Sequence, residues 1–143
     1  MSKASGVSNF TIGHLKEAFQ TGGRVDVNQV EFHPSLYQKE LKEFCDANDV
    51  HMTAYSPLAR GQDLELPSIR SIAEERNVPA GQVIINWIRQ KDMSVIPKST
   101  NPDRIESNFG ALNWTLTEHE ISQIDQEHTD NRLINPEFAE FEA

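Results

Sequence analysis

Three consecutive segments decide the fold: Val25-Asp26-Val27-Asn28-Gln29-Val30, then residues 38–48, then Met52-Thr53-Ala54-Tyr55-Ser56. The two outer segments are short and rich in apolar and β-branched residues, which is typical of strands. In the middle segment Leu41, Phe44 and Cys45 recur at the spacing of one helical face. Since strands joined through a helix run parallel, these residues predict a βαβ unit with a right-handed crossover.

The same alternation of short apolar runs and amphipathic stretches continues on both sides of this unit. Upstream, Gly6-Val7-Ser8-Asn9-Phe10 predicts a strand, and Thr11 offers an N-cap for a helix that ends at Thr21-Gly22-Gly23. Downstream, the pattern predicts helices over 67–77 and 79–91, a strand over 94–97, a helix opened by Asn101-Pro102, and a last helix opened by a capping box from Thr117 to Glu120. The order βαβαβααβαα indicates the α/β class, and periodicity alone leaves open whether the parallel sheet is open or part of a barrel.

Length and composition limit the possible functions. The 143 residues suit one domain over 1–143, shorter than the ~250 residues of a complete (β/α)8 barrel, and the polar stretch 129–143 predicts an irregular C-terminal tail. The net charge of −9 argues against nonspecific binding to nucleic acid or to an anionic membrane. The sequence shows neither a secretory signal nor a membrane-spanning apolar run, which predicts a cytoplasmic protein. The single cysteine, Cys45, is expected to be a buried thiol.

Polar residues gather at the ends of the predicted strands. They are Ser8-Asn9, Asn28-Gln29-Glu31, Tyr55-Ser56 and Lys98-Ser99. Ligands of parallel α/β folds bind at the carboxyl ends of the strands, so four strands that end alike predict one binding edge. Each of these groups, taken alone, is explained as well by capping and turn formation.

The last of these strand ends has the chemistry of an anion site. Pro97-Lys98-Ser99-Thr100 leads into a helix start, where free backbone N–H groups and the helix dipole favour negative charge. Arg104 lies in the first turn of that helix and is placed to add a bidentate phosphate contact. A solvated helix end that binds nothing is the alternative.

Two aromatic side chains at the strand ends have both a functional and a structural interpretation. Tyr55 is suited to stacking on a planar ring, and a half-buried structural tyrosine is the commoner case. His33, beside Pro34, is more typical of a structural histidine than of a catalytic one. The glycine-rich fingerprints of Rossmann and P-loop proteins are absent from the sequence.

Taken together, the sequence resembles the aldo-keto reductase family from Lys3 to about Phe138. The resemblance is carried by Gly6-Val7-Ser8-Asn9-Phe10, Asn28-Gln29-Val30-Glu31-Phe32-His33-Pro34, Ala54-Tyr55-Ser56-Pro57-Leu58, and Ile96-Pro97-Lys98-Ser99 with Arg104 and Asn108. The order and spacing of these motifs also agree with the family. The resemblance implies the C-terminal half, strands five to eight, of a (β/α)8 TIM barrel: four parallel strands with flanking helices.

The resemblance also implies that the matching residues bind NADP(H). Ser8, Asn9 and Gln29 would hydrogen-bond the nicotinamide carboxamide, and Tyr55 would stack on the nicotinamide ring. The other implied contacts are to the pyrophosphate from Ser56 and Leu58, to the adenosine 2′-phosphate from Lys98, Ser99 and Arg104, and to the adenine from Asn108. The 2′-phosphate contacts favour NADP(H) over NAD(H).

Two residue-level departures weaken this correspondence. Ser107 stands where the family often has a Glu just before the adenine-contacting Asn, which puts part of the adenine contact in question. The loop from Ala59 to Pro67 is short and is expected to wrap the pyrophosphate less fully.

The largest departure is the catalytic group, which in this family is an Asp, a Tyr, a Lys and a His on the first four strands. The Tyr is the general acid that protonates the carbonyl oxygen during hydride transfer. Those strands have no counterpart in this sequence, so the chain alone is expected to be a weak or inactive oxidoreductase. Tyr55, Lys98 and His33 match other family positions.

A half-barrel has two unpaired strand edges and one uncovered sheet face, which favour association with another chain. We predict a homodimer or larger assembly, or a complex with a chain that carries the first half-barrel. Three functions remain open: a cofactor-binding half without activity, an active reductase completed by a partner, and a noncatalytic scaffold or interaction module. Retention of Lys98, Ser99 and Arg104 favours the first two.

Overall fold

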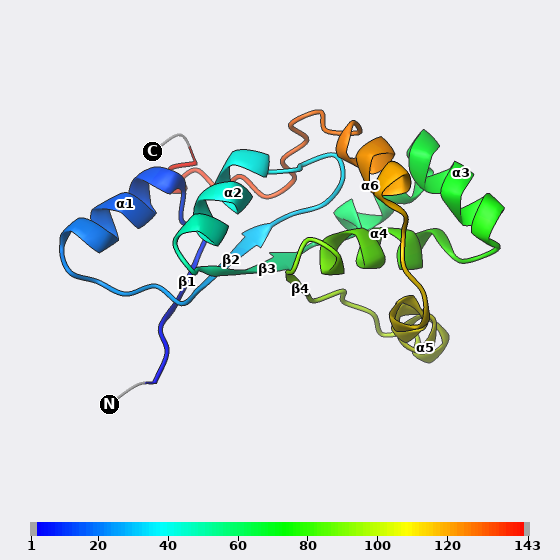
Figure 1. Ribbon diagram of the computed structural model, residues 1–143, viewed down its shortest axis with the longest axis horizontal. Helices are drawn as coiled ribbons and strands as arrows, with labels where there is room; N and C mark the ends of the chain where they lie inside the picture. Colours follow the sequence, from blue (N-terminus) through cyan, green and yellow to red (C-terminus); the bar gives the residue numbers. More distant parts are fainter. Residues whose placement is uncertain (1–2, 142–143) are drawn as a thin grey trace.

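The sheet of the protein contains four parallel strands in the spatial order β1-β2-β3-β4 (Figure 1). A computed structural model describes residues 3–141. Its strands are β1 Gly6–Ser8, β2 Val27–Glu31, β3 His51–Tyr55 and β4 Ser94–Val95. Its helices are α1 Ile12–Gln20, α2 Lys39–Ala47, α3 Pro67–Arg76, α4 Ala80–Arg89, α5 Pro102–Phe109 and α6 Glu118–Asp125, with 3-10 segments η1 Ala59–Glu65 and η2 Gly110–Asn113.

The strand order distinguishes a barrel segment from an open parallel sheet, a choice that periodicity alone leaves open. Each strand pairs with the next one in sequence, and right-handed crossovers between such strands place the connecting helices on one face of the sheet. A doubly wound sheet would instead reverse its strand order and carry helices on both faces. The sheet is therefore built as a segment of a (β/α)8 barrel, which confirms the predicted half-barrel fold.

Side chains that point toward the helices form the core. Val30, Met52 and Ala54 are buried in one cluster with Ile84 and Trp87 of α4, both of which are fully buried. The Trp87 ring stacks on Phe32, with ring centroids 5.3 Å apart. The burial of these side chains on one face follows from the two-residue alternation of a strand and the apolar stripe of a helix.

The opposite sheet face, which lines the interior of a complete barrel, is open. Ser8, His51 and Ser94 are exposed on it, and Ile96, just beyond β4, is 47% exposed. This face is polar compared with the branched aliphatic layers that fill most barrel interiors. An uncovered face of this kind is tolerated by a sheet only because its side chains are largely hydrophilic.

The helix starts agree with the signals in the sequence. The Thr11 hydroxyl accepts from the backbone N–H of His14, and Thr117 forms a capping box with Glu120. The Asn101 side chain accepts from the backbone N–H of Arg104 and so caps α5. The predicted strand over 94–97 is longer than β4, in which only Ser94 and Val95 are in register with β3.

The 3-10 segment η1 was not predicted. It replaces an irregular loop after Leu58, and it is kinked at Arg60 and Gly61, which have φ values of 55° and 95°. A positive φ favours Gly at the second of these positions and interrupts any helical periodicity that a sequence pattern would reveal.

The C-terminal segment, residues 129–141, forms no helix or strand but is firmly attached to the end of the sheet. It runs from α6 back toward α1 (Figure 1). The backbone N–H groups of Thr129 and Asn131 donate to the carbonyl of Ser35 at 3.1 and 3.0 Å. Residues 142–143 of the predicted irregular tail, and residues 1–2 of the predicted domain, lie outside the described range. No helix within residues 3–141 is long and apolar enough to cross a membrane.

The thiol of Cys45 is expected to resist modification in the folded protein. Cys45 is fully buried, as predicted, and burial raises its pKa to about 11. Since the thiolate is the reactive form, an aromatic disulfide reagent at pH 8 should react only at the rate of unfolding. Rapid stoichiometric reaction without denaturant, at a rate unaffected by stabilising solutes, would contradict this packing.

Candidate functional site

The carboxyl ends of β1, β2 and β3 bring four of the predicted cofactor residues together. Ser8 pairs with Gln29 in the β1–β2 register. The Ser8 hydroxyl and the backbone N–H of Asn9 both donate to the Gln29 carbonyl, at 3.0 and 2.9 Å. The hydroxyl of Tyr55, at the end of β3, donates to Oδ1 of Asn9 at 2.9 Å. The structure thus gathers Ser8, Asn9, Gln29 and Tyr55 at one edge of the sheet.

Ser56 and Leu58 lie directly beyond this group, in the turn that leads into η1. Ser56 has a φ of 48°, and its carbonyl accepts from the backbone N–H of Ala59 at 2.9 Å. The carbonyl of Leu58 accepts from Gly61 at 2.7 Å. The turn is therefore rigidly closed by its own backbone.

The second group of predicted residues lies around the start of α5. The backbone N–H of Ile96 donates to the carbonyl of Ala54 at 3.2 Å, so the segment carrying Lys98 and Ser99 leaves the sheet beside the end of β3. Ser99 accepts from the backbone N–H of Asn101 at 3.1 Å, which shapes the entry to the helix. Lys98 and Arg104 are exposed.

No ion pair or side-chain hydrogen bond engages Lys98 or Arg104 anywhere in the described part of the chain. Asp103 lies in the same first turn of α5, so the local balance of these three side chains is one positive charge (two minus one). Further along α5, Oδ1 of Asn108 lies 3.7 Å from the point where a Cβ on Gly81 would stand, so Asn108 faces α4. Two unpaired cations near a helix start favour the approach of an anion such as a phosphate.

A buried ionic cluster at the end of β2 was not foreseen from the sequence. Nε2 of His33 lies 3.0 Å from Oε1 of Glu31, and Nδ1 of His33 lies 3.1 Å from Oδ2 of Asp63. Ser35 donates to Asp63 through its backbone N–H at 2.9 Å and through its hydroxyl at 2.6 Å. Glu31, His33 and Asp63 are almost entirely shielded from solvent. We call this group the Glu31–His33–Asp63 triad.

The protonation of the triad follows from its geometry. Burial alone would lower the pKa of His33, but the hydrogen bonds and charges of Asp63 and Glu31 outweigh burial and raise it. Burial would raise the pKa of Glu31 and of Asp63, and the hydrogen bonds that each receives lower it instead. These shifts, and a carboxylate beside each ring nitrogen of His33, favour an imidazolium held between two carboxylates.

The C-terminal segment completes this cluster. The backbone N–H groups of Leu133 and Ile134 donate to the two carboxylate oxygens of Glu31 at 2.8 and 3.0 Å. The sequence already places Glu31 among the polar residues at the end of β2, on the inner face with Val27 and Gln29. Nothing in the sequence pattern marks Asp63 or the backbone of residues 133–134 as its partners.

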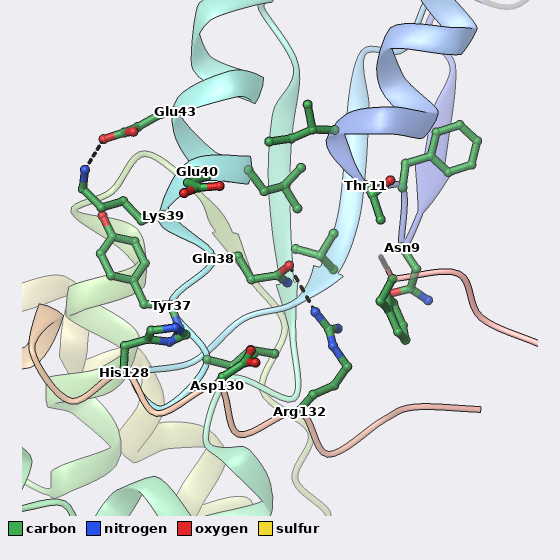
Figure 2. Close-up of a pocket in the computed structure, with 16 residues that line it drawn as sticks. Asn9, Thr11, Tyr37, Gln38, Lys39, Glu40, Glu43, His128, Asp130 and Arg132 are labelled. Atoms are coloured by element: carbon green, nitrogen blue, oxygen red, sulfur yellow. Dashed lines mark hydrogen bonds and ion pairs between the residues drawn. The ribbon is translucent and has the colours of Figure 1, made fainter. Parts of the chain in front are cut away.

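A cavity of about 630 Å³ lies on the helical side of the sheet rather than at the predicted cofactor residues. It is lined by the starts of α1 and α2 and by the C-terminal segment (Figure 2). Of the predicted cofactor residues only Asn9 reaches it. Its charged side chains are mostly engaged with neighbours: Arg132 with Gln38 at 3.3 Å, and Lys39 with Glu43 at 2.6 Å. The side chains of Glu40 and Asp130, which also line the cavity, have no hydrogen-bond or ion-pair partner within residues 3–141.

The chain belongs to the Aldo/keto reductase family, whose profile it matches over residues 2–128. It is 42% identical over 135 residues to a 9,11-endoperoxide prostaglandin H2 reductase of Trypanosoma cruzi, which covers 92% of this chain and 48% of that protein. It is 40% identical over 148 residues to the glycerol 2-dehydrogenase (NADP(+)) of Saccharomyces cerevisiae, which covers 99% of this chain and 47% of that protein.

Solved structures agree with this assignment. A Gox0644 variant in complex with NADPH superposes with a TM-score of 0.87 at 35% identity, covering 93% of this chain and 50% of that one. An aldo-keto reductase from a Medee basin deep-sea metagenome gives a TM-score of 0.89 at 33% identity and covers 51% of that chain. The chain spans about half the length of the relatives it matches.

Proposed function

We propose that this chain is the NADP(H)-binding half of an aldo-keto reductase barrel. The observation that carries the proposal is the pair of unpaired, exposed cations, Lys98 and Arg104, at the start of α5 in a chain whose net charge is −9. Two unpaired cations at a helix N-terminus of an acidic protein favour the binding of a phosphate there. Ser99 and the loop before α5 would complete the contacts to the 2′-phosphate.

The other predicted residues fit the rest of the cofactor. Ser8, Asn9 and Gln29 present polar groups at the carboxyl end of the sheet, with Tyr55 beside them. Ser56 and Leu58 would line the pyrophosphate, and Asn108 would contact the adenine from α5. When bound, NADPH supplies the hydride for carbonyl reduction, and this chain's residues bind and orient it. The NADPH-bound relative and the NADP(+)-dependent relative support the choice of cofactor.

Neither tyrosine of this chain is free to act as the proton donor for that reaction. Its two tyrosines are both committed: Tyr55 donates to Asn9, and Tyr37 packs against Phe32 and Trp87 with its pKa raised to about 12 by burial and neighbouring carboxylates. A carbonyl oxygen therefore meets no positioned acid, and we expect weak or no reductase activity without a partner.

Another chain would cover the open face and edges of the half-barrel. Helix α5 buries none of its residues, and the exposed side chains of Ile105, Phe109 and Leu112 recur at helical spacing to form an apolar strip along α5 and η2. Ile96, just beyond β4, is exposed as well. Phe109 is 67% exposed and Leu112 59%. Such a strip is costly in water and is suited to a protein interface. The partner is a second copy of this chain or a chain with the first half-barrel, and in the second case the complex is an active NADPH-dependent carbonyl reductase.

Replacing Arg104 or Lys98 by Ala should weaken NADPH binding by about tenfold or more, because each removes a charged contact to the 2′-phosphate. Binding of NADH, which lacks that phosphate, should hardly change. Fluorescence titration with both cofactors measures the difference.

The matched control for this experiment is Arg70→Ala on α3, where Arg70 is exposed and paired with Glu65 at 3.0 Å, away from α5. Equal losses for NADPH and NADH, or an equal effect of the control, would contradict the assignment of the 2′-phosphate site.

A further inference from the structure

The hydroxyl of Tyr55 makes a contact that ring stacking does not require. It donates to Oδ1 of Asn9 at 2.9 Å, and these two residues are far apart in the sequence and lie at the ends of different strands, β3 and β1. The bond therefore spans the end of β2, which lies between those strands. The role that this bond gives to Asn9 rests on the proposed function, NADP(H) binding, and adds to it the way in which Asn9 is held.

The backbones of both partners are fixed independently of this bond. Asn9 has a φ of 61°, a left-handed conformation that Asn tolerates better than most residues, and its N–H is bonded to the Gln29 carbonyl. Tyr55 pairs with Glu31 in the β2–β3 register, and its carbonyl accepts from Phe32. The Tyr55–Asn9 bond thus selects a side-chain orientation between two rigid points.

That orientation determines which hydrogen-bonding groups remain free. Because Oδ1 of Asn9 accepts from Tyr55, Nδ2 of Asn9 is turned away as a donor, and it has no partner within residues 3–141. Because the Ser8 hydroxyl donates its proton to the Gln29 carbonyl, its oxygen is left as an acceptor. The Gln29 side chain is also without a partner in the described chain.

These free groups match a primary carboxamide. A carboxamide carries one carbonyl oxygen, which needs a donor, and one NH2 group, which needs acceptors. We propose that Tyr55 is a positioning residue that holds Asn9 with Nδ2 outward as the donor to the nicotinamide carbonyl, while Ser8 and Gln29 accept from the NH2 group. The raised pKa of Tyr55, caused by burial and by the charge of Glu31, keeps its hydroxyl protonated for this bond.

The first test compares Tyr55→Phe with unaltered protein. Phe retains the ring and loses only the hydroxyl, so NADPH should bind about 3- to 10-fold more weakly, the effect of one neutral hydrogen bond. Adenosine 2′,5′-bisphosphate, which lacks nicotinamide, should bind equally to both. Tyr37→Phe is the matched control, because Tyr37 is the only other tyrosine and its hydroxyl has no hydrogen-bond partner in the described chain.

A cofactor analogue tests the direction of the bond. The 3-acetylpyridine analogue of NADP keeps the carbonyl and lacks the NH2 group. If Nδ2 of Asn9 donates to the carbonyl, Tyr55→Phe should weaken binding of this analogue by the same factor as it weakens NADPH. An analogue affinity that Tyr55→Phe leaves unchanged would overturn the assigned orientation.

A measurement without cofactor distinguishes the positioning role of Tyr55 from the proposed binding of NADP(H). The side-chain amide signals of Asn9 in a nitrogen–proton correlation spectrum should shift in Tyr55→Phe and stay in place in Tyr37→Phe. Unchanged Asn9 signals in Tyr55→Phe would overturn the positioning role of Tyr55. An unchanged NADPH affinity in Tyr55→Phe, with intact bisphosphate binding, would do the same. Either result would leave the proposed NADP(H) binding standing. If unaltered protein binds neither NADPH nor the bisphosphate, the proposed function falls, and the role of Tyr55 toward the carboxamide falls with it.

Discussion

Replacing His33 by Gln is expected to lower the free energy of unfolding by about 3–5 kcal/mol, the usual effect of breaking a buried ion pair from one side. The imidazolium of His33 is the only cation between the carboxylates of Glu31 and Asp63 in the described chain, and it lies 3.0 and 3.1 Å from them. Gln cannot carry a positive charge, so two negative groups would remain buried and uncompensated. Urea unfolding followed by the fluorescence of Trp87 and Trp114 measures the change.

The control for His33→Gln is His119→Gln, which changes an exposed histidine on α6. The free energy of unfolding of this surface variant should stay within about 0.5 kcal/mol of that of the unaltered protein. If His33→Gln lowers the free energy of unfolding by less than about 1 kcal/mol, a charged triad is contradicted. A loss of that size is typical of an ordinary neutral hydrogen bond.

The triad also predicts how stability depends on pH. The pKa of His33 is raised above 6.5 in the folded protein, so its stabilisation is complete below pH 6.5 and is lost as the pH rises through the folded pKa. The pKa values of Glu31 and Asp63 are lowered from 4.5 and 3.8, so their stabilisation is present above those values and is lost as the pH falls below them. We expect maximal stability between these limits.

Above pH 6.5 the free energy of unfolding should therefore fall by up to about 1.4 kcal/mol per pH unit until His33 is deprotonated in the folded state. The same slope should be absent from His33→Gln. A free energy of unfolding that rises toward pH 6.5 and is then flat up to pH 8 in the unaltered protein would contradict the charged triad, because that is the profile of a His buried in its neutral form.

Supplying the first four strands of an aldo-keto reductase barrel as a separate chain should raise carbonyl reduction by about 10²–10⁴-fold over this chain alone, the usual contribution of a positioned general acid. The added chain provides the acid that Tyr37 and Tyr55 cannot provide. It would also pair with the edges at β1 and β4 and cover Phe109 and Leu112 on the α5 side. Oxidation of NADPH, followed by absorbance after mixing the two chains, measures the gain.

Two variants show whether the gain arises from the assembled barrel. A first-half chain whose catalytic Tyr is replaced by Phe should associate without restoring the rate. Phe109→Glu on this chain should prevent association, because it places a charge in the apolar strip, and should leave the stability of the exposed helix nearly unchanged. Association of the two chains with no gain in rate would contradict the proposed division of the active site.

The fold was predictable because local signals agree with it at each step. Thr11, Asn101 and Thr117 mark helix starts that the structure confirms, and the apolar face of residues 79–91 predicts the buried side of α4. The choice between an open sheet and a barrel segment needed more, because strand order is a long-range property. The resemblance of the motifs to the family predicted a barrel segment, and the strand order β1-β2-β3-β4 confirms that prediction.

The candidate site was predictable only in part. Ser8, Asn9, Gln29 and Tyr55 follow from their places at strand ends, which parallel strands bring to one edge. The Glu31–His33–Asp63 triad was missed because it joins β2, η1 and the C-terminal segment, and no sequence period relates these three. A buried charge is recognised by its partners, and here the partners include backbone N–H groups that carry no residue signal.

The most direct test of the account is titration of the purified chain with NADPH, followed by cofactor fluorescence, with particle size measured by sedimentation on the same sample. Saturable binding below millimolar cofactor, displaced by adenosine 2′,5′-bisphosphate and weakened in Lys98→Ala and Arg104→Ala, is the result we predict. Absence of binding at millimolar NADPH in a folded sample would contradict a cofactor site built by this half of the barrel.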